Sequence, residues 1–413
     1  MSRRLEVRLH DQPIGTLSET PDGGSEFRFH RTYRDLAPRP VLGQKFEDDL
    51  DRIYRSRKGQ RLPDFFANLI PEPGGKLREV IEDAGALEAG DDLALLTFVG
   101  EDLPGAVVVY PSEEPEAWSG AQKSPKLQAT QETPPPGEEF RFSLAGVQLK
   151  FSMLLQEEKL TLPARGRSGE WIVKFDSPTF PHLPENEYSM LEWAQAAGFD
   201  VPPRHLLGVE SLEGFSRQYA LQETKVLAIQ RYDRTPEGRV HQEDFAQVVG
   251  LPPRRKYDQI TYEAMARLVH RFMDAAAVEE WVRRLTFVLA SGNNDAHLKN
   301  WSFIYPDQIR AQWSPLYDQV STIAWQAPAR QLSLKLVSTR EFNQIDRQTF
   351  RRLAERAELD PKRTLVLVDE TLEKLRRSWK EIKDALPLPI DHARALQEHW
   401  KQVPILRQSG TLD

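Results

Sequence analysis

The stretch SGNNDAHLKN, residues 291–300, lies between two apolar runs, LTFVLA and WSFIY. Most of its side chains are polar or charged, although the chain enters a core on either side. Phosphoryl transfer needs a carboxylate that orients the attacking hydroxyl, and hard oxygen ligands that hold Mg²⁺ on a triphosphate. Asp295 and Asn300 offer both and stand five residues apart, as the catalytic Asp and metal-binding Asn of protein kinases do. The spacing favours a phosphotransfer loop; the alternative is a solvated loop in which Asn and Asp form turns.

A second acidic residue follows downstream. WSFIY, the turn PDQ and IRAQW have the pattern of a hairpin, after which LYDQVST supplies Asp318. We expect this aspartate at a strand end, facing the loop of Asp295, where a second metal ligand belongs.

Two upstream segments complete the pattern. Residues 143–152, SLAGVQLKFS, form a small-residue turn in which Gly146 would let backbone N–H groups approach phosphate oxygens; a plain hairpin turn is the alternative. Lys174 in WIVKF occupies a strand interior, a costly place for a lysine unless an anion meets it. The alternative is an edge-strand lysine that points into water. Glu187, on the helix that follows, is a candidate partner for Lys174.

The histidines do not suggest a metal centre. All nine lack the HExxH pattern or a close HxH spacing, so chelation by histidine is not expected. For His297 we favour a structural role in the loop over proton transfer.

Composition bounds the class of protein. The chain has 413 residues, 39% of them hydrophobic, which is enough to fold into two or three globular domains. Its charge of −7 arises from 55 basic and 62 acidic residues spread along the chain, so a role on DNA would require a partner. The absence of cysteine excludes disulfides and thiolate chemistry. No apolar run reaches the roughly 20 residues of a membrane span, and we expect a cytoplasmic protein without membrane contact.

Periodicity predicts an α+β protein in four segments. Residues 1–110 combine alternating strands such as LEVRLH and FRFH with the helical patterns DFFANLI, KLREVIEDAG and DDLALLTFVG. Residues 111–139 are rich in Pro, Glu, Ser and Gln and are predicted to be a linker. Residues 140–257 read as a β-rich nucleotide-binding lobe, and residues 258–413 as a helical catalytic lobe. A β-rich lobe followed by a helical lobe is the order of a bilobal kinase fold, though order alone is an analogy.

The motifs together resemble the HipA family, bacterial serine/threonine kinase toxins of type II toxin–antitoxin modules. LPDFFANLIPEPGGKLREVI and LLTFVGEDLPGAVVVY are similar to the family's amino-terminal domain, and FRFSLAGVQLKFSM to its phosphate loop. IQRYDR and HQEDFAQVVGLPPRRKY are similar to its nucleotide edge, and SGNNDAHLKNWSFIY with SPLYDQVST to its catalytic and metal segments. The resemblance implies a protein-kinase-like fold, related to phosphoinositide kinases, with an extra small amino-terminal α+β subdomain.

The resemblance also implies roles for individual residues. It makes Asp295 the catalytic base, Asn300 and Asp318 the Mg²⁺ ligands, Lys174 the ATP-phosphate lysine and Ser143 an autophosphorylated serine. The residues implied to lie around ATP are Ser143, Ala145, Gly146, Val147, Gln148, Lys150, Lys174, Gln230, Arg231, Tyr232, His297, Lys299 and Asp318.

Three functions remain in competition at this point. The first, implied by the resemblance, is an ATP- and Mg²⁺-dependent toxin kinase that phosphorylates an aminoacyl-tRNA synthetase, glutamyl-tRNA synthetase above all, and so arrests translation. Its partner would be a helix-turn-helix (HipB-like) antitoxin, through which alone it would meet DNA. The second is a small-molecule or lipid kinase. The third is a mainly non-catalytic corepressor bound to that antitoxin.

Overall fold

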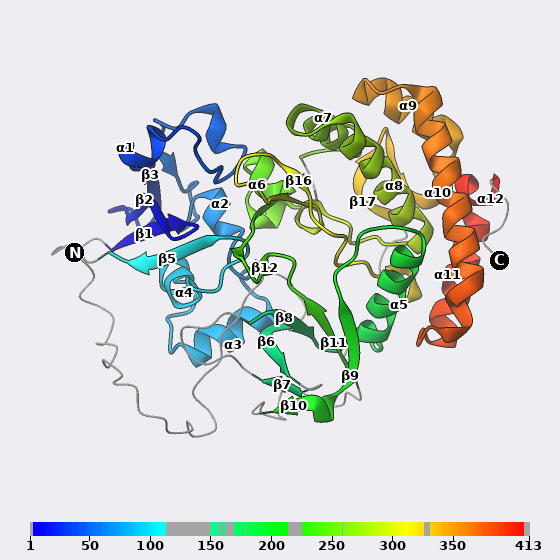
Figure 1. Ribbon diagram of the computed structural model, residues 1–413, viewed down its shortest axis with the longest axis horizontal. Helices are drawn as coiled ribbons and strands as arrows, with labels where there is room; N and C mark the ends of the chain where they lie inside the picture. The colour runs from blue at the N-terminus through cyan, green and yellow to red at the C-terminus, as the bar shows by residue number, and fades with distance from the viewer. Residues whose placement is uncertain are drawn as a thin grey trace. The chain divides into compact units, whose positions relative to one another are not determined.

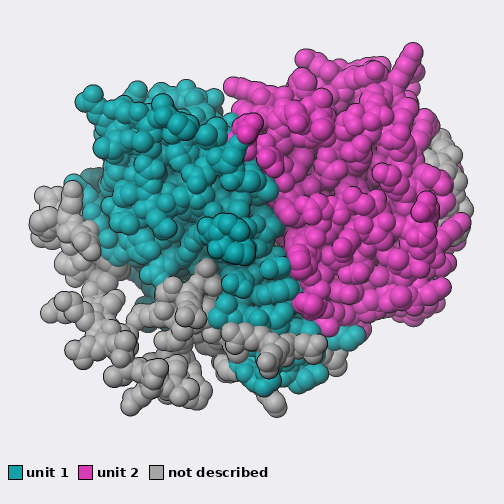
Figure 2. Space-filling model, viewed as in Figure 1, with its two compact units in different colours: residues 1–175, 207–253, 304–309 teal, residues 176–206, 254–303, 310–413 magenta. Residues whose placement is uncertain are grey.

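The computed structural model describes residues 3–112, 150–156, 159–161, 169–177, 179–213, 225–257, 259–325 and 331–408. The chain divides into two compact units (Figure 2). Unit 1 comprises residues 1–175, 207–253 and 304–309, and unit 2 comprises residues 176–206, 254–303 and 310–413. The first unit is rich in strands and the second in helices (Figure 1), so the predicted α+β class is confirmed.

Unit 1 begins with an antiparallel five-stranded sheet in the order β4-β3-β2-β1-β5. Its strands are β1 (Arg4–Leu9), β2 (Gln12–Glu19), β3 (Ser25–Phe29), β4 (Tyr54–Arg55) and β5 (Val107–Pro111). Burial alternates along β1 as the sequence predicts, because every second side chain faces the core. The helices of this part are α1 (Arg31–Arg34), α2 (Asp64–Ala67), α3 (Lys76–Ala84) and α4 (Asp92–Phe98).

A six-stranded sheet follows in the order β10-β7-β6-β8-β11-β9. Its strands are β6 (Lys150–Gln156), β7 (Lys159–Thr161), β8 (Trp171–Lys174), β9 (Arg204–Gly208), β10 (Leu212–Glu213) and β11 (Lys225–Gln230). Shorter elements come next in the chain: β12 (Arg234–Thr235), β13 (Gly238–Arg239), β14 (His241–Asp244) and α6 (Phe245–Val249).

One hydrophobic core serves both sheets of unit 1. Val7 and Val107 of the first sheet belong to the same buried cluster as Met153, Val173 and Val226 of the second. Because this core is continuous, the predicted segment 1–110 and the strands of the next lobe lie in one compact unit. The predicted linker lies outside the described residues except at its first two positions.

Unit 2 is built mainly of helices. They are α5 (Leu183–Ala196), α7 (Tyr262–Phe272), α8 (Ala275–Ser291), α9 (Arg347–Ala357), α10 (Pro361–Ile382), α11 (Ile390–Gln402) and α12 (Pro404–Gln408). The remaining strands of the chain are β15 (Ser302–Tyr305), β16 (Gln312–Trp313) and the hairpin of β17 (Gln331–Leu336) and β18 (Thr339–Glu341). No helix in the described part of the chain is both long and apolar enough to cross a membrane.

Three tryptophans hold the helices of unit 2 together. Trp193 of α5 packs edge-on against Trp379 of α10, with ring centroids 4.9 Å apart, and Trp379 packs in the same way against Trp400 of α11 at 5.3 Å. Trp400 donates its indole N–H to the carbonyl of Ala290 on α8, over 2.7 Å. This cluster fixes the carboxyl end of α8, from which the polar decapeptide departs.

A buried glutamate lies in unit 1. Glu243 of β14 accepts hydrogen bonds from the Tyr305 hydroxyl and, at 2.9 Å, from the Gln44 backbone N–H. Its other carboxyl oxygen is buried without a hydrogen-bond partner among the described residues. Burial raises the pKa of Glu243 to about 8 from its ordinary value of 4.5, so the carboxyl group keeps its proton at neutral pH.

The stability of unit 1 should therefore fall as the pH rises. Between about pH 4.5 and 8 the unfolded chain has lost the Glu243 proton while the folded chain retains it, and folding weakens through this interval. The melting temperature of the wild type should fall between pH 5 and pH 8. Glutamine is an uncharged isostere of glutamic acid, so for Glu243→Gln we expect this fall to be a few degrees smaller than in the wild type. An identical pH dependence in wild type and variant, measured by thermal unfolding, would contradict the assignment.

Candidate active site

The polar decapeptide begins where α8 ends. Gly292 caps the helix in the left-handed conformation, at φ +63°, and an added Cβ there would lie 2.5 Å from Ile323 Cγ1. Glycine is required both by the backbone angle and by this close approach. The chain thereby turns abruptly from the buried helix into the loop of Asp295.

Two asparagines fix the backbone of Asp295. The buried Asn293 accepts from the Asp295 N–H through Oδ1 at 2.9 Å, and Asn300 donates from Nδ2 to the Asp295 carbonyl at 2.8 Å. The Asp295 side chain remains half exposed. The loop thus presents a carboxylate on a backbone that is held from both sides.

The segment of Asp318 is joined to this loop within unit 2. Asn293 donates to the Asp318 carbonyl at 3.4 Å, and Thr322 accepts from the Asn294 N–H at 2.7 Å. Asp318 has φ +51°, a conformation that aspartate tolerates better than most residues and that is common at functional sites. The structure therefore brings together the two sequence-distant segments that were predicted to meet.

A third element anchors the Asp318 segment. The amide of Asn186, fully buried on α5, accepts from the Ser321 N–H at 2.8 Å and donates to the Ser321 carbonyl at 3.3 Å. Its Nδ2 also lies 3.0 Å from His392 Nδ1. Sequence reasoning missed Asn186, because a polar residue in an amphipathic helix pattern gives no sign that it is buried. Its neighbour Glu187 is buried too.

His297 is not a candidate for proton transfer. Burial, reinforced by the charges of Lys256 and Lys299, lowers the pKa of His297 well below 6.5, so the ring is neutral at physiological pH. Its Nε2 lies 4.0 Å from Asp295 Oδ1, beyond hydrogen-bond distance. This geometry supports the structural role expected from the sequence.

Tyr257 is the neighbour of Asp295 that the sequence did not reveal. Its hydroxyl donates to Asp295 Oδ1 at 2.6 Å. The only signal was the position of this tyrosine in PPRRKY, a segment that we associated with the nucleotide edge.

The donor set suits magnesium in part. Within the described ranges, no three His, Cys, Asp or Glu side chains converge so that they could hold a metal ion. Mg²⁺ in phosphotransfer sites is, however, held by one or two protein oxygens, substrate phosphates and water. With Nδ2 of Asn300 turned to the Asp295 carbonyl, its amide oxygen and the Asp318 carboxylate are ligands of the required hard type.

Lys174 belongs to unit 1. It ends β8, which lies between β6 and β11, and its side chain is only 3% exposed. The alternative of an edge-strand lysine in water is therefore wrong.

Lys150 stands opposite Lys174 in the β6–β8 register. The remaining predicted residues of the phosphate loop, Ser143, Ala145, Gly146, Val147 and Gln148, lie outside the described residues. Glu187 belongs to unit 2, and its pairing with Lys174 therefore stays a prediction.

The segment Gln230–Tyr232 has a structural task in unit 1. Arg231 is fully buried and donates to Asp102 at 2.7 Å and to both oxygens of Asp233 at 3.0 Å. Burial alone would lower the pKa of Arg231, but Asp102 and Asp233 outweigh it and raise that pKa above its ordinary value. The guanidinium is thus committed to protein carboxylates, and any contact of Arg231 with adenine would come from its backbone and stays a prediction. For the Gln230 side chain and Tyr232, which hydrogen-bonds Gln242, the adenine contact stays a prediction.

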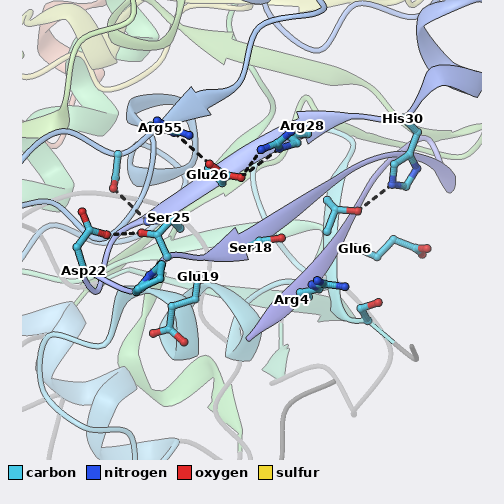
Figure 3. A pocket seen from close by; sticks show the side chains of 15 residues that line it. Arg4, Glu6, Ser18, Glu19, Asp22, Ser25, Glu26, Arg28, His30 and Arg55 are labelled. Carbon is cyan, nitrogen blue, oxygen red and sulfur yellow. Dashed lines mark hydrogen bonds and ion pairs between the residues drawn. The ribbon is translucent and has the colours of Figure 1, made fainter. Parts of the chain in front are cut away.

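A pocket on the five-stranded sheet contains none of the predicted site residues. It lies over the polar face of β1, β2 and β3, where Arg28 and Arg55 both pair with Glu26, at 2.8 and 3.0 Å (Figure 3). The whole lining carries three arginines and four carboxylates, which nearly balance, so the pocket presents no strong field to a ligand.

Comparison with known proteins agrees with this architecture. Residues 5–110 match the HipA N-terminal domain, and residues 142–379 match the HipA-like C-terminal domain. "Putative kinase Y4dM" of Sinorhizobium fredii is 37% identical over 409 residues, 98% of each chain. "Serine/threonine-protein kinase toxin HipA" of Shewanella oneidensis is 27% identical over 310 residues, 68% of each chain.

A solved structure has the same fold. The chain superimposes on a complex described as the Shewanella oneidensis MR-1 toxin–antitoxin system HipA, HipB and its operator DNA, with a TM-score of 0.73 and 21% identity, over 99% of this chain and 98% of that one. Both family domains are present in order and the fold is shared along the whole chain. On this evidence, the chain belongs to the HipA family.

Proposed function

We propose that the protein is an ATP- and Mg²⁺-dependent serine/threonine kinase. The observation that carries the proposal is the joining of the Asp295–Asn300 loop to the Asp318 segment through hydrogen bonds to the carbonyls of Asp295 and Asp318. This joining supports a carboxylate base and two hard oxygen ligands acting in one site. Asp295 would accept the proton of the acceptor hydroxyl, and Lys174 would contact the ATP phosphates. Mg²⁺, held by Asn300 and Asp318, would neutralise the charge of the transferred phosphoryl group.

We further propose a toxin role with a protein substrate. Two relatives in Sinorhizobium fredii are named "Putative kinase Y4dM" and "Putative kinase Y4mE", and the HipA homologue in Shewanella oneidensis is named a serine/threonine-protein kinase toxin. The neighbouring solved structure contains HipB and operator DNA. By analogy, this chain would bind a helix-turn-helix antitoxin and reach DNA only through it. Its substrate would be an aminoacyl-tRNA synthetase, with glutamyl-tRNA synthetase the first to test.

Replacing Asp318 by alanine should weaken nucleotide binding as well as turnover. Loss of a metal ligand is expected to lower Mg²⁺-ATP affinity by about tenfold or more, whereas ATP without Mg²⁺ should bind equally to variant and wild type. Calorimetric titration with and without Mg²⁺ measures both. The exposed Asp384, mutated to alanine, is the matched control. Equal Mg²⁺-ATP affinity in Asp318→Ala and wild type would remove Asp318 from the metal site.

Ser143 is proposed as the site of self-inactivation. A phosphate there would add a charge of about −1.5 to −2 beside the position of the γ-phosphate and repel the nucleotide. After incubation with Mg²⁺-ATP, we expect mass spectrometry to find phosphate on Ser143 and ATP affinity to fall about tenfold or more, while Ser143→Ala keeps its affinity. Phosphate only at other positions, or undiminished binding by the Ser143-phosphorylated protein, would rule out this switch.

A further inference from the structure

The Tyr257 hydroxyl occupies a place on Asp295 that an acceptor hydroxyl would need. It lies 2.6 Å from Oδ1 and donates its proton to that oxygen. A general base must come within about 2.6–3.2 Å of the hydroxyl that it deprotonates. A carboxylate oxygen can accept more than one hydrogen bond, so an acceptor has to displace the tyrosine only if it approaches Oδ1 from the side that the Tyr257 hydroxyl occupies.

Three further contacts hold Tyr257 in this position. Its ring meets His297 edge-on, with centroids 5.0 Å apart at 75°. Lys256 Nζ lies 5.4 Å from the centre of the ring. From the hairpin of β17 and β18, Arg340 donates to the Tyr257 carbonyl at 2.6 Å. All these groups belong to unit 2, so the arrangement is complete within one compact part of the protein.

The side chain is nevertheless able to leave. Tyr257 is 40% exposed and is one of the few large hydrophobic residues with that much surface in the described structure. Swinging the ring into solvent would break the hydrogen bond to Asp295 and the ring contacts with His297 and Lys256, but would open no core cavity. The cost in packing would therefore be small.

We propose that Tyr257 is a gate on the acceptor side of the site. This gate rests on the proposed function, because it acts only if Asp295 is the base. The Tyr257 hydroxyl occupies Oδ1 and so competes with water and with non-specific acceptors for that oxygen, whereas a correct substrate segment displaces the hydroxyl. The gate would limit wasteful ATP hydrolysis and would make phosphotransfer depend on binding of the acceptor protein.

The test uses water as the acceptor, so no substrate has to be known. ADP release from Mg²⁺-ATP is measured for wild type, Tyr257→Phe, Asp295→Asn and the double variant. Tyr257→Phe removes only the hydroxyl and keeps the ring against His297. Tyr188→Phe on α5, where the hydroxyl neighbours Glu192, is the matched control. Melting temperatures establish that each variant is folded.

We expect Tyr257→Phe to hydrolyse ATP about 3- to 10-fold faster than wild type, with an unchanged KM for ATP. Tyr188→Phe should behave as wild type, and Asp295→Asn should be inactive in both backgrounds. A folded Tyr257→Phe that is no faster than wild type, with Asp295→Asn inactive, overturns the gate and leaves the proposed function intact. Full hydrolysis by Asp295→Asn would instead overturn the proposed function itself.

Discussion

Asp295→Asn is expected to lower the rate of phosphotransfer about 10²- to 10⁴-fold, the range that a positioned general base contributes. The amide keeps the shape of the carboxylate and its oxygen still accepts from Tyr257, but it cannot take up the proton of the attacking hydroxyl. The backbone bonds from Asn293 and Asn300 do not involve the altered side chain, so the loop should keep its conformation. Incorporation of labelled phosphate from ATP, into the protein itself or into a synthetase, measures the effect.

Two further measurements separate catalysis from folding in this variant. The affinity for Mg²⁺-ATP and the melting temperature should both match wild type, because Asp295 is assigned to the acceptor and not to the metal. The conservative change Asp384→Asn at an exposed position controls for the loss of one charge. Phosphotransfer by Asp295→Asn at a rate near that of wild type would show that another group is the base.

The largest effect on stability is expected from Arg231→Ala. This change leaves the two negative charges of Asp102 and Asp233 buried. Among the described ion pairs, one cation then remains to balance them, Arg234, which lies 3.1 Å from Asp102 and 2.9 Å from Asp233. Removing one partner of a buried ion pair costs about 3–5 kcal/mol, since the remaining charge loses its counterion without regaining water. We expect a clearly lower denaturation midpoint in urea, and poor expression of the variant.

An exposed ion pair provides the contrast. Arg394 pairs with Asp391 on α11, and both side chains are mostly in solvent, at 67% and 80% exposure. Such pairs are worth at most about 1 kcal/mol, so Arg394→Ala should leave the midpoint nearly unchanged. If Arg231→Ala were equally harmless, the buried network would not be what joins residues 102–105 to residues 231–234.

Local patterns in the sequence were sufficient for most elements. Alternation of apolar side chains identified β1 and β3, and 3.6-residue periodicity identified α2, α3 and α4, because these signals depend only on neighbouring residues. Boundaries were less certain. Within residues 258–413, predicted only as a helical lobe, the structure ends α7 at Phe272 and begins α8 at Ala275, because the Asp274 side chain caps the new helix through the Ala277 N–H.

For the candidate site too, the sequence revealed local features but not the contacts between distant segments. Asp295 and Asn300 lie in one loop, so their spacing could be read directly. The expected meeting of this loop with the Asp318 segment is seen at the Asp318 carbonyl, which accepts from Asn293, but Asp318 lies five residues beyond the end of β16 and not at a strand end, and its role as a metal ligand stays a prediction. Neither the hydroxyl of Tyr257 on Asp295 nor the support from Asn186 could be foreseen, because both depend on which distant backbone segments pack together.

The sequence by itself determined the strands, the helices, the polar loop and the family resemblance. Only the tertiary structure decided that Arg231 is a buried ion-pair partner, and that the five-stranded and six-stranded sheets of unit 1 share one core. The physical reason is that periodicity records which face of an element is apolar. Contacts between residues more than a hundred positions apart, such as Asp102 and Arg231, decide which other element covers that face. The same contacts decide which charges are buried together.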